Sequence, residues 1–267
     1  MESFFYWKGK LEQTVEVKLL INEHSYNSTL KVKNLSKNFG TIKAVKNLNF
    51  SIEESSTVAL LGSNGAGKTT TIMMLMGILK PSFGEVRIFD YNVFSNRNKI
   101  SRSINFASPF IELPHRLSVE QNLKIYGHLY GVKNLSEKIK KLSKDLELKD
   151  LLKRKVGKLS TGQKTRLALA KALINDPKIL FLDEPTASLD PDHADWIRTY
   201  LEKYQMLTKA TIILASHNML EVERLCSNVL MMKSGLLVDQ GSPKNLIRHY
   251  GRSNLEEVFL TIARSKK

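Results

Sequence analysis

Cysteine is almost absent from this 267-residue chain: Cys226 is the single one, so no disulfide can form within it. That usage is typical of a reducing compartment. Long apolar runs are also missing, because the best candidate, residues 72–79, is interrupted by Gly77 and falls short of the roughly 18 residues that span a bilayer. The first residues combine acidic Glu2 with an aromatic cluster at 4–7, which is not a signal peptide. We therefore expect a cytoplasmic protein that reaches a membrane only through a partner.

Acidic residues are scarce beside basic ones. The chain has 41 Lys and Arg against 26 Asp and Glu, a net charge of +15. Such an excess is typical of a solvated basic surface, and equally of a protein attracted to phosphates, nucleic acid or the inner membrane face. The hydrophobic fraction of 42% is ordinary and is sufficient for the core of a large α/β domain. Charge therefore leaves the partner open.

Apolar patterns follow one another along the chain in the order of an α/β fold. Half-buried strands are indicated by alternation at 30–33, 48–52 and 85–89. Continuous apolar runs, typical of buried parallel strands, lie at 57–61, 179–182, 211–214 and 229–232, and helical patterns at 119–130, 136–146, 162–174, 192–206 and 219–226. This alternation predicts a parallel sheet with helices on both faces. We interpret the chain as an extension of unknown role at 1–29 and one domain at 30–267, with an inserted helical lobe at about 105–160.

A phosphate-binding loop follows the first buried run. Residues 62–69 read Gly-Ser-Asn-Gly-Ala-Gly-Lys-Thr and match the pattern G-x-x-x-x-G-K-[ST] at every fixed position, between a strand and a helix. Such a loop turns several backbone N–H groups toward phosphates, at the positive end of a helix. Lys68 would reach the terminal phosphates, and Thr69 would offer its hydroxyl to Mg²⁺. The residues expected to contact the nucleotide are Gly62, Ser63, Asn64, Gly65, Ala66, Gly67, Lys68, Thr69 and Thr70.

Two acids follow the second buried run. Asp183 ends it and Glu184 comes directly after. The carboxyl ends of parallel strands are where α/β sheets bind ligands. Asp183 is therefore expected to hold Mg²⁺ through water, and Glu184 to orient or deprotonate the attacking water. Alone, the pair is a weak signal; beside a phosphate loop it predicts ATP hydrolysis.

A third segment resembles the signature of a known family. Leu159-Ser-Thr-Gly-Gln163 is similar to the L-S-G-G-Q motif of ABC ATPases, and Ser160 lies 23 residues before Asp183. Thr161 stands where that family usually has glycine. The resemblance implies that Ser160, Gly162 and Gln163 contact the γ-phosphate of a nucleotide held by another subunit. Taken alone, Ser160 is more simply a helix N-cap.

Further positions resemble the same family over roughly residues 30–263. Phe39 stands where an aromatic ring stacks on adenine, although it is equally an ordinary strand residue. The segment that ends at Asp190 resembles a loop that crosses the dimer interface, and His217, 34 residues after Asp183, resembles the histidine that contacts the γ-phosphate. The resemblance implies a P-loop NTPase ABC-ATPase fold with a RecA-like core, an antiparallel β subdomain and the helical lobe. It also implies ATP and Mg²⁺ as ligands, a second ATPase subunit and transmembrane permease subunits.

One position departs from that family. A glutamine that touches Mg²⁺ usually begins the helical lobe, and Pro109 stands in its place, after Ser108. Proline offers no ligand, so either the Ser108 hydroxyl or a water completes the coordination shell, or the contact is lost.

Two other hypotheses for the function of this chain are open. A soluble ABC ATPase that acts on ribosomes or DNA would suit the basic charge, but the single set of motifs and the short gap between them argue against it. A nucleotide-binding regulator that does not hydrolyse would not need Lys68, Asp183 and Glu184 together. Residues 254–260 resemble the ending of exporter ATPases, although they also fit a plain amphipathic helix. We expect a transporter ATPase, of export type, peripheral on the inner face of the membrane, and no nucleic-acid partner.

Overall fold

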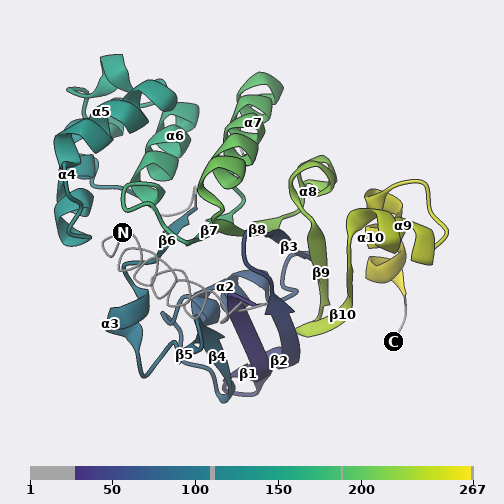
Figure 1. Ribbon diagram of the computed structural model, residues 1–267. Helices are drawn as coiled ribbons and strands as arrows, with labels where there is room; N and C mark the ends of the chain where they lie inside the picture. Colours follow the sequence, from purple (N-terminus) through teal and green to yellow (C-terminus); the bar gives the residue numbers. More distant parts are fainter. Residues whose placement is uncertain (1–27, 109–111, 188, 266–267) are drawn as a thin grey trace, which may run out of the picture.

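The computed structural model describes residues 28–108, 112–187 and 189–265, which fold around two sheets (Figure 1). The core sheet has the order β10-β9-β3-β8-β7-β6, and a smaller sheet has the order β2-β1-β4-β5. Core strands are β3 (Thr57–Leu61), β6 (Ile104–Ala107), β7 (Ile179–Asp183), β8 (Thr211–Ser216), β9 (Asn228–Lys233) and β10 (Leu236–Gly241). The antiparallel sheet contains β1 (Leu30–Phe39), β2 (Ile42–Ile52), β4 (Phe83–Ile88) and β5 (Tyr91–Asn92). These findings confirm the fold class.

Successive residues of the core strands pack into two different hydrophobic clusters. Ala59 and Leu61 of β3 belong to one cluster, whereas Val58 and Leu60 belong to the other. Side chains alternate across a strand, so the two clusters cover opposite faces of the sheet. All five residues of β3, and all five of β7, are buried. That burial on both faces explains why these strands read as unbroken apolar runs.

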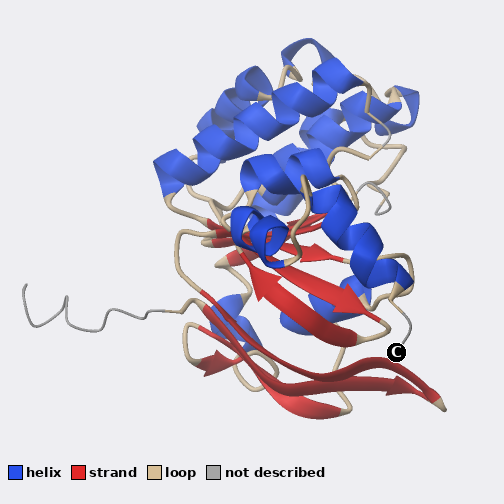
Figure 2. Ribbon diagram, turned by 90° about the vertical axis from the view of Figure 1, so that its right-hand side faces the viewer, coloured by secondary structure: helices blue, strands red, loops and turns tan. Residues whose placement is uncertain are grey.

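Each face of the sheet has its own layer. On one side pack α4 (Val119–Leu129), α5 (Leu135–Asp145), α6 (Thr161–Ala172), α7 (Pro191–Thr208), α8 (Met219–Leu225), α9 (Pro243–His249) and α10 (Leu255–Arg264). On the other side pack α2 (Lys68–Leu75), α3 (Arg97–Ile100) and the antiparallel sheet. Figure 2 shows the antiparallel sheet at the base, the core sheet above it and the large helices at the top. Two short 3-10 helices, η1 (Lys149–Leu151) and η2 (Val156–Lys158), join α5 to α6.

Two boundaries predicted from the sequence need correction. Strand β6 pairs in parallel with β7, so residues 105–107 lie in the core sheet and not in the helical lobe. Its four residues are too few and too mixed to stand out as an apolar run. Thr29 is buried and its carbonyl accepts from the Phe89 backbone N–H at 3.0 Å, so it packs with the antiparallel sheet. Residues 1–27, most of the predicted extension, lie outside the described residues.

One strand of the core sheet is not parallel. Strand β10, which the sequence patterns did not indicate, runs antiparallel to β9 at the edge of the sheet. It carries no continuous apolar run, because an edge strand is only partly buried. No helix in the described part of the chain combines the length and the hydrophobicity needed to cross a bilayer.

Candidate nucleotide site

The phosphate loop joins β3 to α2 and depends on its glycines. Gly67 is the N-cap of α2 with φ 100°, and Gly65 has φ 80°. A Cβ atom at Gly62 would lie 2.5 Å from the carbonyl oxygen of Met232, and one at Gly67 would lie 2.7 Å from that of Ala44. These backbone conformations and approaches exclude a side chain. The loop is therefore held against β9 on one side and β2 on the other.

The N-terminus of α2 carries no side-chain cap. Gly67 offers none, so the first N–H groups of the helix are available to an anion. The Lys68 ammonium, with the side chain buried, donates to the carbonyl oxygens of Gly62 at 2.6 Å and Ser63 at 3.2 Å. Thr69 is exposed on the first turn of the helix. Bare amides, one cation and one hydroxyl are the groups that a nucleotide phosphate chain requires.

Asp183 and Glu184 lie close to Lys68. Burial lowers the pKa of Lys68, and the charges of Glu184 and Asp183 act against that shift. Burial likewise raises the pKa of Asp183, with a further contribution from Glu184, while Lys68 opposes both. These charges act on one another because the fold places Lys68 near Asp183 and Glu184, which are more than 100 positions further along the sequence. The strand order places β8 alone between β3 and β7, so these segments meet at the carboxyl edge of the sheet.

Glu184 has a strained backbone and a histidine partner. Its φ is 52°, in the left-handed region, and its N–H donates to the Ala215 carbonyl at 2.8 Å. Nδ1 of His217 lies 2.7 Å from Oε1 of Glu184. The His217 side chain is 66% exposed and that of Glu184 only 14%. The structure therefore joins the two residues proposed for catalysis directly to each other.

A buried carboxylate that the sequence analysis did not assign lies behind this pair. Glu221 is fully buried on α8 and accepts from the hydroxyls of Thr186, at 3.0 Å, and Ser216, at 2.6 Å. Thr186 is two residues after Glu184, and Ser216 directly precedes His217. The sequence feature that could have indicated this buried carboxylate is an acidic residue on the core-facing side of a short helix, one residue before the apolar Val222.

Ser160 begins α6 and caps it. Its Oγ accepts from the Gln163 N–H at 3.3 Å, while Oε1 of Gln163 accepts from the Ser160 N–H at 3.0 Å. This reciprocal pair is a capping box, and Gly162 lies within it. Helix α6 packs on the face of the sheet opposite α2. The signature segment and the phosphate loop of one chain therefore belong to different faces.

Two further predicted residues lie at the ends of elements. Asp190 caps α7, where Oδ1 accepts from the His193 N–H at 3.0 Å; Ser188, in the same segment, lies outside the described residues. Phe39 ends β1 and is 48% exposed, with the Lys37 ammonium 5.1 Å from the centre of its ring. An exposed ring at a hairpin is free to stack on a ligand, although nothing in the fold requires it there.

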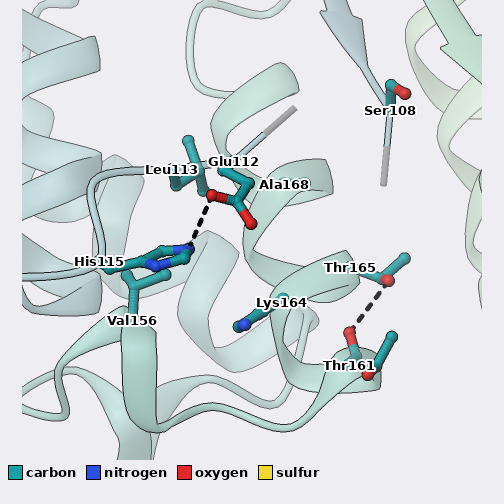
Figure 3. Close-up of a pocket in the computed structure, with 9 residues that line it drawn as sticks. All are labelled: Ser108, Glu112, Leu113, His115, Val156, Thr161, Lys164, Thr165 and Ala168. Atoms are coloured by element: carbon teal, nitrogen blue, oxygen red, sulfur yellow. Dashed lines mark hydrogen bonds and ion pairs between the residues drawn. The ribbon is translucent and has the colours of Figure 1, made fainter. Parts of the chain in front are cut away.

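The start of the helical lobe is only partly described. Pro109 lies outside the described residues. Ser108 is buried at the end of β6 and lines a cavity of about 200 Å³ beside the first turns of α6. Figure 3 shows Ser108 apart from the two linked pairs of that cavity, Glu112 with His115 and Thr161 with Thr165. Whether Ser108 replaces the family glutamine stays a prediction.

The donor set fits a nucleotide-bound Mg²⁺. Among the described residues, no three His, Cys, Asp or Glu side chains gather as a closed metal cluster. Mg²⁺ keeps several waters and takes one or two protein oxygens beside substrate phosphates. The Thr69 hydroxyl, on the first turn of α2, and the Asp183 carboxylate, at the end of β7, would supply that number.

Comparisons with known proteins identify the family. The family described as "ABC transporter" matches residues 45–187. The ABC transporter ATP-binding protein NatA of Bacillus subtilis (strain 168) is 32% identical over 223 residues, 82% of this chain and 90% of that protein. The Nod factor export ATP-binding protein I of Rhizobium sp. (strain N33) is 35% identical over 229 residues, 84% of this chain and 74% of that protein.

Solved structures give the same answer. A dimeric ATP-binding cassette in a post-hydrolysis state, bound to ADP and Pi, matches with a TM-score of 0.74 at 26% identity, over 80% of this chain and 98% of that one. The chain therefore belongs to the ABC transporter family, as an ATP-binding subunit that hydrolyses ATP.

Proposed function

We propose that this chain drives export through separate transmembrane subunits, by hydrolysing Mg-ATP at sites shared between two ATPase subunits. The observation that carries the proposal is the placement of the two phosphate-binding segments. The loop before α2 and the capped end of α6 pack on opposite faces of the core sheet. A second copy of the chain, or a homologous subunit, would present its Ser160 to the nucleotide on this chain's Lys68.

The proposed mechanism assigns one task to each residue. The loop amides and the Lys68 ammonium bind the β- and γ-phosphates. Thr69 and Asp183 would hold Mg²⁺, which when bound would neutralise charge on the phosphate oxygens. Glu184 accepts a proton from a water molecule whose oxygen attacks the γ-phosphorus. The bond between the γ-phosphorus and the β–γ bridging oxygen breaks, which yields ADP and phosphate. His217, 2.7 Å from Glu184, orients that carboxylate and contacts the γ-phosphate once it is bound.

Export as the direction rests on two supports. A relative that is 35% identical is named an export ATP-binding protein. Helix α10 contains residues 255–260 of the segment that resembles the ending of exporter ATPases, with Leu255, Val258 and Ile262 packed into the core. The proposed site of action is the inner face of the cell membrane, where permease subunits would recruit the chain. The transported substrate would contact those subunits and not this one.

The dimer is tested with Glu184→Gln. This variant should keep ATP binding but stop turnover, so Mg-ATP should convert it into a stable dimer in sedimentation experiments. Adding Lys68→Ala to the same chain should abolish that dimer, because the nucleotide no longer binds. A Glu184→Gln chain that stays monomeric with Mg-ATP, even with the membrane subunit present, contradicts the shared site.

The transport partner is tested by affinity purification of the full chain after detergent extraction and nuclease treatment. An integral membrane protein should copurify in stoichiometric amount. Recovery of ribosomal particles instead would favour a soluble, non-transport ATPase. Direction follows from vesicles that contain the complex: export requires ATP on the face where this chain lies and movement of substrate away from it.

A further inference from the structure

We infer that Glu221 is a positioning residue for hydrolysis: its carboxylate ties together the two loops that carry Glu184 and His217. This inference rests on the roles proposed above for those two residues. The Glu221 side chain accepts its hydrogen bonds from Thr186 and Ser216, and it acts through these two residues.

The carboxylate bridges two segments that are distant in sequence. Oε1 of Glu221 accepts from the Thr186 hydroxyl in the turn after β7, and Oε2 accepts from the Ser216 hydroxyl at the end of β8. Thr186 and Ser216 are both buried, as is Glu221 itself. Hydrogen bonds to a carboxylate are stronger than those between neutral groups, and stronger still where water is excluded; the bond from Ser216, at 2.6 Å, is the short one of the two. The bridge therefore fixes the separation of the two loops.

Each bridged residue lies in a hydrogen-bonded turn beside its catalytic neighbour. The Ser216 oxygen that donates to Glu221 accepts from the Asn218 N–H at 3.0 Å, so it encloses His217 in a tight turn. On the other loop, the Ala187 N–H donates to the Glu184 carbonyl at 3.1 Å, in the turn that contains Thr186. The 2.7 Å contact between Glu184 and His217 lies between these two anchors.

The cost of burial argues for a positional use of this acid. Burial raises the pKa of Glu221 above its ordinary value, while the hydrogen bonds from Ser216 and Thr186 lower it. A buried acid without such partners is strongly unfavourable. Apolar side chains in place of Glu221, Thr186 and Ser216 would remove that cost of burial. We therefore attribute the bridge to the loops that it holds in position, and not to a gain in stability.

Helix α8 offers a matched control two residues away. Oε1 of Glu223, which is exposed, accepts from the Leu255 N–H at 2.7 Å, at the start of α10. This acid also joins α8 to a distant segment, but to one that carries no catalytic residue. Glu221→Ala removes two such connections and Glu223→Ala removes one, and only those of Glu221 lead to the loops of the hydrolytic residues.

The experiment compares these variants in the full chain, with its membrane partner where turnover requires it. Glu221→Ala should lower kcat by on the order of 10- to 100-fold, the effect expected of a misplacement near 1 Å, with nucleotide affinity within a few-fold. Thr186→Val should lower kcat less than Glu221→Ala does. Glu221→Gln should keep a higher kcat than Glu221→Ala, because the amide retains an acceptor oxygen. Glu223→Ala should lower the melting temperature but leave the kcat of the folded protein unchanged.

A spectroscopic measurement makes the test independent of turnover. The imidazole nitrogen resonances of His217 should shift in Glu221→Gln and Thr186→Val, because the contact with Glu184 loosens, and should stay unchanged in Glu223→Ala. Equal kcat and equal His217 spectra for the folded Glu221 and Glu223 variants overturn the inference. Full turnover by Glu184→Gln in the same preparation would instead overturn the proposed function. If Glu221→Ala does not fold, Glu221→Gln and Thr186→Val decide.

Discussion

Helices α2 and α6 begin in opposite ways, although both are proposed to bind phosphate. Gly67 at the start of α2 leaves its first N–H groups without a side-chain cap, whereas Ser160 and Gln163 cap α6 in both directions. The bare end can bind an anion with its own chain's groups. The capped end already satisfies two of its donors. This difference suggests that α2 supplies most of the affinity for a nucleotide and that α6 adds selectivity for a closed dimer.

A third helix shows that capping alone says little about function. Helix α4 begins with the same box, in which Ser118 and Gln121 bond reciprocally. No phosphate chemistry is proposed there. The roles of the two boxes must therefore be separated by experiment.

The largest effect is expected at the bare helix end. Lys68→Ala removes the buried cation beside the phosphates and should lower ATPase activity about 10²- to 10³-fold, as loss of one preorganised charge-stabilising group does. Lys164→Ala, in the first turn of α6, is the matched control and should leave turnover within a few-fold. Turnover and nucleotide binding are measured for both, with circular dichroism to check the fold. Near-normal turnover by Lys68→Ala would refute the phosphate-loop assignment.

The second prediction separates the two ends between chains. Lys68→Ala and Ser160→Arg should each be nearly inactive alone, since every shared site then lacks one end. Mixing them should restore turnover in the mixed dimers, because one of the two sites pairs an intact Lys68 with an intact Ser160. The recovered activity is measured as a function of mixing ratio. If no ratio restores activity, the ends do not meet across an interface.

The third prediction compares the two capping boxes. Ser160→Ala and Ser118→Ala should each cost about 1 kcal/mol of unfolding free energy, because each removes an N-cap acceptor. Only Ser160→Ala should also lower turnover, and it should leave nucleotide binding by the single chain unchanged. Denaturant unfolding and steady-state kinetics provide the two readouts. Equal turnover in both variants would show that Ser160 acts only as a structural helix cap and not in hydrolysis.

The smallest effect is expected where β6 leads into the helical lobe, at the start of the segment between β6 and α4. Ser108→Ala should weaken Mg²⁺-dependent hydrolysis or its stimulation by the membrane partner, and Pro109→Gln should leave ATP affinity within a few-fold, since Mg²⁺ readily keeps waters. A Mg²⁺ titration of ATPase activity measures both. If Ser108→Ala is silent in every condition, no side chain replaces the family glutamine here.

Sequence patterns predicted the buried elements well and the edges poorly. The run at 57–61 coincides with β3, and the helical pattern at 119–130 lies within one residue of α4. Strand β10 was missed because an edge strand is only partly buried and carries no continuous apolar run. Strand β6 was missed because its four residues are too few to stand out, and the approximate start of the lobe was therefore placed inside this strand. The central strands could be predicted from the sequence because their side chains are buried on both faces of the sheet, and not because of strand propensity.

The sequence by itself determined the chemistry that is local. The phosphate loop needs glycine where φ is positive and where backbone approaches within 3 Å, and these requirements are met within eight consecutive residues. The cap of α6 is equally local, since Ser160 and Gln163 are three residues apart. Only the tertiary structure decided which distant residues meet. The order β3-β8-β7 brings Lys68, Asp183 and His217 to one edge of the sheet, and the packing of α8 on that sheet places Glu221 against Thr186 and Ser216. Strand order depends on contacts between segments far apart in the chain, which no local pattern encodes.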